Sequence, residues 1–369
     1  MLKRVEFTNY RGFKGSPQPY CMEGLARVNL IVGKNNSGKT ALLEGIQFLA
    51  SGGESSVLAD IANRRGEVVI SGPEHSPLVN LHHFFHGHEF SPGSPLLIKA
   101  NAGDPSVEVC VDKIEKNKKK IDREFRSSLF SFTLTIIWDE GTNGISSVCG
   151  LTRDGIADDP AFGQRSSRLG IGRKSTRPAN LFIGTDSSDY QTLASLWDEV
   201  TLSGLEEEVC DALRLLDSGI QSVHPLTGMS PNGFSAGRAG FVVGLKSKKA
   251  RIPLGSLGEG MRRMLTLAMA IACVPGGFLF VDEIDTGLHY SVMTDMWKLV
   301  IKKAIASNIQ VFATTHSWDC ISGLAQICQL EPELSGEVAV HKIDKNIPRS
   351  IPFTGESLVG MVPNDIDPR

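Results

Sequence analysis

The clearest indication of the fold of this 369-residue chain is the segment Gly33-Lys34-Asn35-Asn36-Ser37-Gly38-Lys39-Thr40. It matches the pattern G-x-x-x-x-G-K-[ST]; an apolar run over 28–32 precedes it and a helical pattern follows it. In this order, small residues let backbone N–H groups turn inward around a phosphate, and the helix adds the positive end of its dipole. We expect Lys39 to bridge the β- and γ-phosphates of ATP and the Thr40 hydroxyl to ligate Mg²⁺. Asn36 suits such a loop because asparagine adopts left-handed backbone angles more readily than most residues.

A second apolar run, over 278–281, ends in the two acids Asp282 and Glu283. A carboxylate at the end of such a strand can hold the hydration shell of Mg²⁺, and an adjacent one can orient and deprotonate an attacking water. Two acids could also cap a strand by chance. With the phosphate loop in the same chain, we assign Asp282 to the metal and Glu283 to the catalytic base.

Three further segments flank these acids in the chain. Before them lies Leu254-Gly255-Ser256-Leu257-Gly258-Glu259-Gly260-Met261-Arg262-Arg263, which leads into an apolar helical pattern. After them come Ile284-Asp285-Thr286-Gly287-Leu288-His289 and then Val311-Phe312-Ala313-Thr314-Thr315-His316-Ser317. Small residues at a helix start make an anion site. Taken singly, however, a glycine-rich helix start and a lone histidine after a strand are usually structural.

The ordered set of these segments resembles ABC-type ATPases of the SMC/RecF class. Within that class it resembles most the ATPase domains of the OLD (overcoming-lysogenization-defect) family and related stand-alone ATPases. The features that carry this preference are Asn9-Tyr10-Arg11-Gly12-Phe13, the pair Asn35-Asn36 and the run 282–289. The resemblance covers residues 1–50 and 250–320.

The resemblance implies a role for each flanking segment. The signature residues Ser256, Gly258 and Gly260 would face the γ-phosphate held by a second subunit, so that dimerisation depends on ATP. The run 284–289 would be the D-loop at the dimer interface, and His316 the switch histidine that contacts the γ-phosphate. The nucleotide-binding residues would be Gly33, Lys34, Asn35, Asn36, Ser37, Gly38, Lys39, Thr40, Ser256, Gly258 and Gly260. The catalytic residues would be Glu283, His316 and Lys39, and the metal ligands Thr40 and Asp282.

Some expected features are missing from the sequence. No Q-loop glutamine can be assigned, because Gln47 falls inside a helical pattern and Gln191 lies in an unplaced region. No heptad pattern persists over three or four repeats, which argues against a long coiled-coil arm. The stretch after His316 is too short for the Toprim nuclease of most OLD proteins. Nuclease or toxin action would therefore need a separate partner chain.

These observations predict an α/β fold, namely a P-loop ABC-type ATPase head with a mixed sheet and an inserted α+β or helical lobe. The head would comprise residues 1–50 and 250–347, the inserted lobe 51–249, and the tail 348–369. The tail is rich in Pro, Asn, Asp and Gly, and could be unstructured or dock on a partner. Strand patterns lie at 2–8, 28–32, 95–100, 107–111, 130–138, 278–281 and 309–314, and helical patterns at 41–50, 113–126, 189–216, 260–273 and 291–306.

The bulk composition is that of an ordinary globular protein. Lys plus Arg number 38 and Asp plus Glu 41, so the net charge of -3 gives no global attraction to nucleic acid or acidic membranes. No apolar run reaches the length of a membrane span, and the N-terminus lacks a signal-peptide core. We therefore expect a cytoplasmic protein without a membrane partner. Its seven dispersed cysteines form no C-x-x-C pair and are expected to be reduced thiols.

Two local signals have competing explanations. His82, His83, His86 and His88 surround Phe84 and Phe85, and only Glu89 could assist them as a metal ligand. An aromatic core or interface is therefore favoured over a metal site. Basic clusters at 116–126 and 165–177 could contact DNA phosphates, although charge runs are more often solvated surface.

The preferred function is ATP hydrolysis by a homodimer or higher homo-oligomer that closes on ATP. Such a machine would control a partner effector, a nuclease or toxin, in anti-phage defence or DNA maintenance. The alternative is a RecF-like, ATP-dependent DNA-binding protein in repair. A scaffold that binds ATP without turnover fits poorly with the intact Lys39, Asp282 and Glu283.

Overall fold

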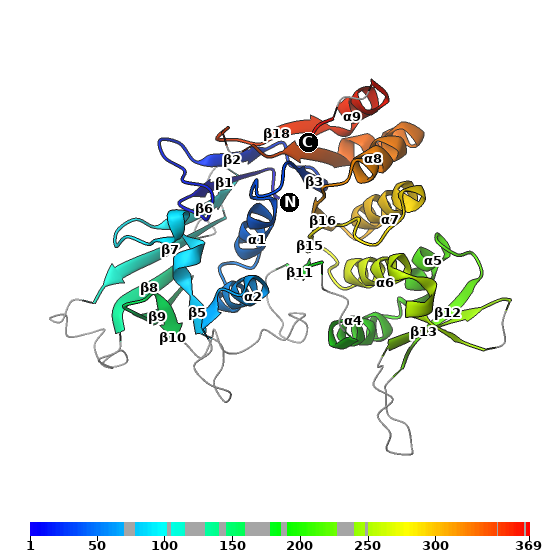
Figure 1. Ribbon diagram of the computed structural model, residues 1–369, viewed down its shortest axis with the longest axis horizontal. Helices are drawn as coiled ribbons and strands as arrows, with labels where there is room; N and C mark the ends of the chain where they lie inside the picture. Colours follow the sequence, from blue (N-terminus) through cyan, green and yellow to red (C-terminus); the bar gives the residue numbers. More distant parts are fainter. Residues whose placement is uncertain are drawn as a thin grey trace, which may run out of the picture. The chain divides into compact units, whose positions relative to one another are not determined.

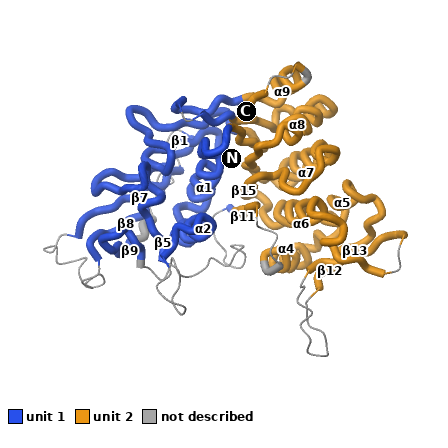
Figure 2. The backbone as a smooth tube through the Cα atoms, in the orientation of Figure 1, with its two compact units in different colours: residues 1–25, 34–178, 342–352 blue, residues 26–33, 179–341, 353–369 orange. Residues whose placement is uncertain are grey.

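The computed structural model describes residues 1–69, 78–101, 105–114, 130–139, 145–158, 178–185, 190–226, 240–247, 250–344, 346–364 and 367–369. The chain forms two compact units, coloured separately in Figure 2. Unit 1 contains residues 1–25, 34–178 and 342–352, and unit 2 contains residues 26–33, 179–341 and 353–369. Each unit is thus assembled from segments far apart in the sequence, and each is described by itself.

Unit 1 is built on a nine-stranded sheet in which all neighbouring strands run antiparallel (Figure 1). Residues alternate between the core and the opposite face, as in β7, where Val107, Val109 and Val111 are buried. The helices α1 (Lys39–Ala50) and α2 (Ser55–Arg65) belong to this unit, as do the short turns η1 (Leu81–Phe84) and η2 (His86–His88). In sheet order the strands are β2 (Tyr20–Glu23), β1 (Arg4–Thr8), β6 (Leu96–Ala100), β7 (Ser106–Lys113), β8 (Phe130–Asp139), β9 (Ile145–Thr152), β10 (Ile156–Asp158), β5 (Leu78–Asn80) and β4 (Val68–Val69).

Most of a second, six-stranded sheet belongs to unit 2. Its order is β11 (Asn180–Ile183), β15 (Phe278–Val281), β16 (Gln310–Thr314), β3 (Val28–Val32), β17 (Val338–Lys342) and β18 (Ile351–Thr354). The first four strands are parallel. Every residue of β3 and β16 is buried, which is typical of a parallel sheet covered on both faces.

The helices of unit 2 follow the strands in the alternation that the sequence predicts. In Figure 1, α6 (Glu259–Ala272), α7 (Met293–Ala306) and α8 (Trp318–Leu330) line up beside the parallel strands. The unit also contains α4 (Tyr190–Ser203), α5 (Glu206–Arg214), α9 (Gly355–Met361) and the short turns η3 (Leu254–Leu257), η4 (Tyr290–Val292), η5 (Pro332–Glu337) and η6 (Val362–Asn364). A small antiparallel sheet joins β12 (Ile220–Leu226), β13 (Gly240–Leu245) and β14 (Ile252–Pro253).

The predicted α/β class is confirmed, and several elements differ in detail. The helical pattern over 189–216, which the sequence indicates to be broken near Gly204, divides there into α4 and α5, because Gly204 takes a left-handed φ of 69° between them. The tail after Pro348 is structured and forms β18 and α9. The helix expected over 113–126 lies almost entirely outside the described residues, and its first residue belongs to β7. The division of the chain near residues 50 and 250 stays a prediction.

Two simpler expectations can be compared with the structure directly. All seven cysteines are free thiols, and burial raises the pKa of Cys21 and Cys110 to about 11 and that of Cys273 to about 12. Among the helices of the described residues, none combines the length and apolar character that crossing a membrane requires.

Candidate functional site: a phosphate loop and a carboxylate edge

The phosphate loop connects the end of β3 to the start of α1. Its turns use left-handed backbone angles at Gly33 (φ 147°), Asn36 (φ 60°) and Gly38 (φ 101°), so the expectation for Asn36 is confirmed. Lys39 is the first residue of α1, is 5% exposed, and donates a hydrogen bond from Nζ to the carbonyl of Lys34 at 3.0 Å. The Lys39 ammonium group therefore lies against the loop, where it could neutralise the charge of a bound phosphate.

The opening segment Asn9–Phe13 packs against this loop and its helix. A Cβ at Gly38 would lie 2.7 Å from Cζ of Phe13. About two turns further along the chain, in α1, a Cβ at Gly45 would lie 2.7 Å from Phe7 and 2.9 Å from Tyr10. Only glycine permits both approaches, so the segment that carried the family resemblance supports the phosphate loop physically.

A largely buried ion-pair network contacts α1, and no pattern in the sequence indicates it. Arg11 is 8% exposed and donates to both carboxylate oxygens of Glu67, at 2.7 and 2.9 Å. Its Nε lies 3.5 Å from Glu44 of α1, and Arg65 donates from Nε to the same carboxylate at 2.8 Å. Burial raises the pKa of Glu44, and Arg65 and Arg11 oppose that shift. The Arg11 guanidinium also lies over the Phe84 ring, 4.7 Å from its centroid.

In unit 2, the two predicted acids stand where β15 ends. Thr314, the last residue of the neighbouring strand β16, donates from Oγ1 to Asp282 at 2.5 Å. The same hydroxyl accepts the backbone N–H of Glu283 at 2.8 Å. Glu283 has a left-handed φ of 47°, which is uncommon for a residue with a long side chain. One threonine therefore holds both acids.

His316 lies in the segment that follows β16, and this segment contacts the D-loop, residues 284–289. Nε2 of His316 lies 4.0 Å from Glu283, and the side chains are 40% and 45% exposed respectively. Thr315 donates from Oγ1 to Asp285 at 2.6 Å and accepts the N–H of Ser317 at 2.9 Å. The structure thus brings Asp282, Glu283 and His316 together, as the sequence predicts.

The strand that leads to the phosphate loop belongs to the same sheet. β3 runs parallel to β16, and the N–H of Thr315 donates to the carbonyl of Ile31 at 3.3 Å. Two residues later, at Gly33, the chain enters the phosphate loop. Because carboxyl ends of parallel strands share one edge of a sheet, β3 ends at the edge of unit 2 that also carries the acids.

The signature segment forms a 3₁₀ turn, η3, followed by the start of α6. Ser256 and Gly258 are exposed, and Gly258 takes a φ of 99° immediately before the helix. A Cβ at Gly260 would lie 3.0 Å from the carbonyl of Gly287, and one at Gly287 would lie 2.8 Å from Cγ of Glu259. The signature helix and the D-loop are therefore in direct contact through two glycines.

Most of the remaining candidates take structural positions. The His82 ring stacks on Phe90 at 4.4 Å, and Nδ1 of His86 donates to the carbonyl of Arg11 at 2.9 Å. Nδ1 of His83 lies 3.2 Å from Nδ1 of His88. Within the described ranges no group of three or more His, Cys, Asp or Glu side chains could hold a metal ion.

The structure describes the remaining unassigned residues only in part. Gln47 is buried in α1 and accepts a hydrogen bond from Arg64 at 2.8 Å, and Gln191 lies in the first turn of α4. The basic clusters at 116–126 and 165–177 lie outside the described residues.

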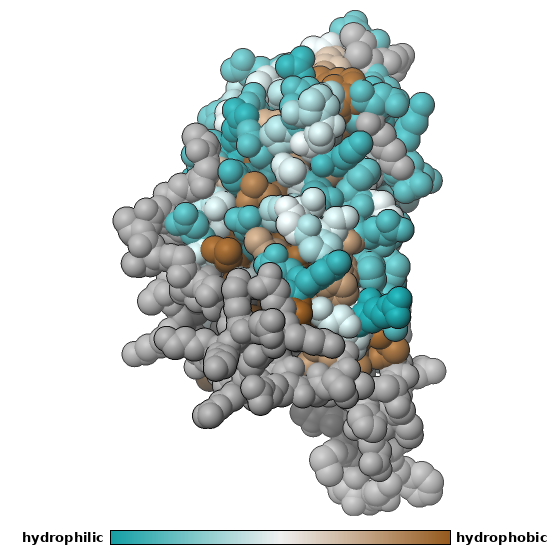
Figure 3. Space-filling model, turned by 90° about the vertical axis from the view of Figure 1, so that its left-hand side faces the viewer, coloured by the Kyte–Doolittle hydropathy of each residue, from teal (hydrophilic) through white to brown (hydrophobic). Residues whose placement is uncertain are grey.

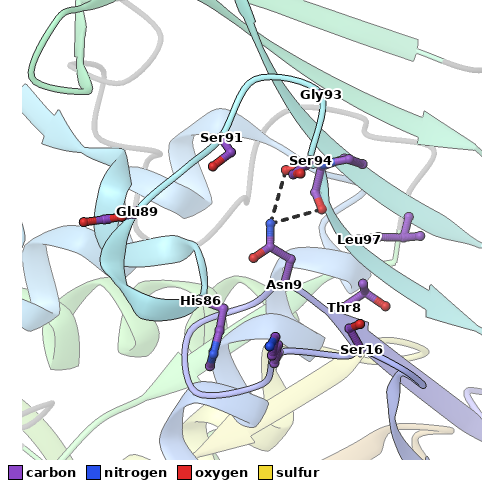
Figure 4. A pocket seen from close by; sticks show the side chains of 11 residues that line it. Thr8, Asn9, Ser16, His86, Glu89, Ser91, Gly93, Ser94 and Leu97 are labelled. Carbon is purple, nitrogen blue, oxygen red and sulfur yellow. Dashed lines mark hydrogen bonds between the residues drawn. The ribbon is translucent and has the colours of Figure 1, made fainter.

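Unit 1 also carries an open hollow of about 530 Å³ (Figure 4). It lies between the turn after β1 and the segment 86–97, and Asn9 crosses it by donating to the carbonyls of Ser94 and Pro95 at 3.2 and 3.4 Å. Its lining includes no residue of the phosphate loop.

On the face drawn in Figure 3, hydrophilic residues predominate among the described atoms and hydrophobic ones stand in small, separate groups.

A phosphate loop that follows a parallel strand, with an Asp-Glu pair at the end of another strand of the sheet, defines a P-loop ATPase. Residues 28–319 match the family described as "AAA domain, putative AbiEii toxin, Type IV TA system", and the chain belongs to this family.

Individual relatives were found by sequence and by structure. An "ATP/GTP phosphatase" of Helicobacter pylori is 24% identical over 402 residues, which cover 97% of each chain. The SMC head domain from Thermotoga maritima has a TM-score of 0.44 at 13% identity, covering 96% of this chain and 98% of that one. An Smc head bound to the C-terminal winged-helix domain of ScpA has a TM-score of 0.48 at 12% identity, with the same coverage.

Proposed function

We propose that two copies of this ATPase close on ATP, that hydrolysis separates them, and that this cycle controls a partner effector. The observation that carries the proposal is the carboxylate edge of unit 2. There, Asp282, Glu283 and His316 lie together at an edge of the sheet where the parallel strand β3 also ends.

Binding would begin at the phosphate loop. Its inward N–H groups and the α1 N-terminus favour an anion, and Lys39 would leave the Lys34 carbonyl to neutralise the β- and γ-phosphates. Mg²⁺ prefers oxygen ligands, and the Thr40 hydroxyl of unit 1 and the half-buried Asp282 carboxylate of unit 2 are each oxygen donors of the kind that would hold it. When bound, Mg²⁺ would offset the charge of the transferring phosphoryl group.

Hydrolysis would use the two side chains that face solvent beside Asp282. Glu283 would accept a proton from the attacking water, since its carboxylate is half exposed and its backbone is fixed by Thr314. His316 would donate a hydrogen bond to the γ-phosphate. Nε2 of His316 lies 4.0 Å from a carboxylate oxygen of Glu283. At this distance Glu283 would contact the water molecule while His316 contacts a phosphate oxygen.

Closure of two copies would complete the site through the signature segment. Ser256 and Gly258 are exposed at the start of α6, and its N–H groups form an anion site only where a ligand approaches from outside. The D-loop packs on the same helix start, and Tyr290 beyond it is 66% exposed. A nucleotide that binds the closed pair more tightly than the open one would shift the population toward the pair.

The partner effector is suggested by the family and by the resemblance of the motifs. The family description includes a putative AbiEii toxin of a type IV toxin–antitoxin system. We propose a separate nuclease or toxin as the effector, acting in anti-phage defence or DNA maintenance.

The test is the substitution Glu283→Gln, measured by phosphate release and by mass photometry with Mg-ATP. We expect turnover to fall about 10²- to 10⁴-fold, the usual contribution of a general base. We also expect an ATP-dependent species of twice the chain mass to accumulate.

Glu333→Gln serves as the matched control, because Glu333 is an exposed acid of unit 2 in η5, away from the carboxylate edge in sequence. It should hydrolyse ATP as the unmodified chain does. Normal turnover of Glu283→Gln would remove Glu283 from its role. An ATP-bound Glu283→Gln chain that stays monomeric would remove the closure step.

A further inference from the structure

Arg263 is a buried cation that binds main-chain carbonyl groups. It lies in the second turn of α6 and is 2% exposed. Its Nη1 donates to the carbonyl of Gly184 at 2.9 Å, and its Nη2 donates to the carbonyls of Asp282 and Glu283, at 2.9 and 2.8 Å. Its Nε makes a longer contact of 3.5 Å with the carbonyl of Ile284. Three consecutive residues that include both functional acids thus converge on one guanidinium group.

The backbone at these acids needs such a donor. The left-handed φ of Glu283 costs about 1–2 kcal/mol for a residue with a Cβ, so the surrounding contacts must stabilise it. From the side of β16, Thr314 accepts the N–H of Glu283, and its carbonyl accepts the N–H of Ile284 at 3.0 Å. Arg263 of α6 donates to the carbonyls of Asp282 and Glu283, so hydrogen bonds from both β16 and α6 hold the turn.

A buried charge is expensive unless its hydrogen bonds are made. Arg263 meets that requirement with carbonyl groups, and a guanidinium suits them because its donors lie in one plane and point apart. A lysine ammonium is a single point charge and could not reach both Gly184, after β11, and the turn after β15. Arginine can therefore hydrogen-bond both backbone segments at this position, and lysine could not.

We propose that Arg263 is the positioning residue of this ATPase: it fixes the turn that aims the Glu283 carboxylate at the attacking water. The inference rests on the proposed role of Glu283 as the base. Arg263 itself is buried beneath the turn and would touch neither ATP nor water. Its removal should therefore lower the rate of the chemical step and leave nucleotide affinity nearly unchanged.

The experiment compares Arg263→Lys with the control Arg251→Lys. Arg251 is an exposed arginine of unit 2 that lies before β14 and outside both the signature segment and α6. We expect Arg263→Lys to lower kcat about 10- to 100-fold, since a displacement near 1 Å of a reacting group can cost about 100-fold. The Kd for a fluorescent ATP analogue should stay within about threefold, and Arg251→Lys should leave both quantities unchanged.

A double variant separates this inference from the proposed function. If Arg263 acts through Glu283, then Arg263→Lys combined with Glu283→Gln should hydrolyse ATP no more slowly than Glu283→Gln alone. Full activity of Glu283→Gln would refute the proposed function. A slow Glu283→Gln chain whose rate falls further by the full Arg263→Lys factor would refute the inference alone.

Two other outcomes also decide the question. Equal losses of kcat and ATP affinity in Arg263→Lys would make Arg263 an ordinary structural residue. If Arg263→Lys does not fold, as circular dichroism would reveal, Arg263→Gln takes its place, because it removes the buried charge and keeps a donor. An unchanged kcat in the folded variant overturns the proposal.

Discussion

Replacing Thr314 by valine is the sharpest test of how the carboxylate edge is built. Thr314 is 1% exposed, and valine has nearly the same shape, so packing is preserved while the hydroxyl is lost. That hydroxyl makes two hydrogen bonds, one to the Asp282 carboxylate and one from the Glu283 N–H. Thr314→Val therefore removes both acids' shared partner without creating a cavity.

The expected loss of stability follows from these two bonds. A buried N–H left without an acceptor costs about 1–3 kcal/mol, and the Glu283 N–H would be left in that position. The half-buried Asp282 carboxylate can regain water, so its net loss is about 1 kcal/mol, the usual net value of one hydrogen bond. We expect the free energy of unfolding to fall by about 2–4 kcal/mol in total.

Thr314→Ser provides the comparison, because it keeps the hydroxyl and loses one buried methyl group, worth about 0.8 kcal/mol. Urea titrations give the difference in unfolding free energy, and phosphate release gives kcat. We expect Thr314→Val to lose kcat about 10-fold or more, since the Glu283 turn loses its support from β16, and Thr314→Ser to keep most of it. Equal stability and equal kcat in the two variants would refute the role of the hydroxyl.

Two further predictions concern other parts of the fold. Gly45→Ala should destabilise the chain by about 1–3 kcal/mol, because the new methyl group would overlap the rings of Phe7 and Tyr10; Gly12→Ala, with nothing near its Cβ, should melt at the original temperature. His341 is fully buried, and burial lowers its pKa from 6.5 to about 4, so the unfolded chain binds its proton first. Unfolding free energy should therefore fall as the pH drops from about 6.5 toward 4 and stay level above, and a His341→Gln chain should lose less over that window; parallel pH curves for the two chains would contradict this.

Local sequence predicted those parts of the site that are contiguous in the chain. The phosphate loop could be placed between a strand and a helix because its pattern, its apolar run and its helical spacing follow one another within 28–50. The acids and His316 were found for the same reason, since each ends an apolar run that proved to be a parallel strand. The meeting of these strand ends then follows from sheet geometry alone.

Contacts between distant residues could not be predicted in this way. Arg11 and Glu67 are 56 positions apart, and nothing in the residues around either one indicates the other. Likewise, the sequence does not reveal that β1 pairs with β6, because alternation fixes which face of a strand is buried but not its neighbour. The antiparallel pairing of the unit 1 sheet therefore does not follow from the sequence, although four of its strands (β1, β6, β7 and β8) coincide with predicted strand patterns.

Arg263 lies between these two cases, because its position in the helical pattern of α6 carries a local signal. Arg262 and Arg263 are identical neighbours, yet one side chain is 37% exposed and the other residue 2%. Four positions on, at one helical turn, Leu267 is fully buried, so Arg263 stands on a core-facing stripe of α6. A charged residue on such a stripe requires a buried partner, and here the partners are carbonyl groups that only the folded chain places within reach.

The strained turn at Glu283 ties these observations together. A glycine would take its φ of 47° at no steric cost, whereas this chain places there the one residue that the proposed reaction needs as a base. Strain of this kind persists only where neighbours over-determine the conformation, and Thr314 and Arg263 do so from opposite sides. Both contacts hold the main chain of Glu283. Under the proposed mechanism, this fixed turn would limit the reorganisation that the base undergoes as ATP and water approach.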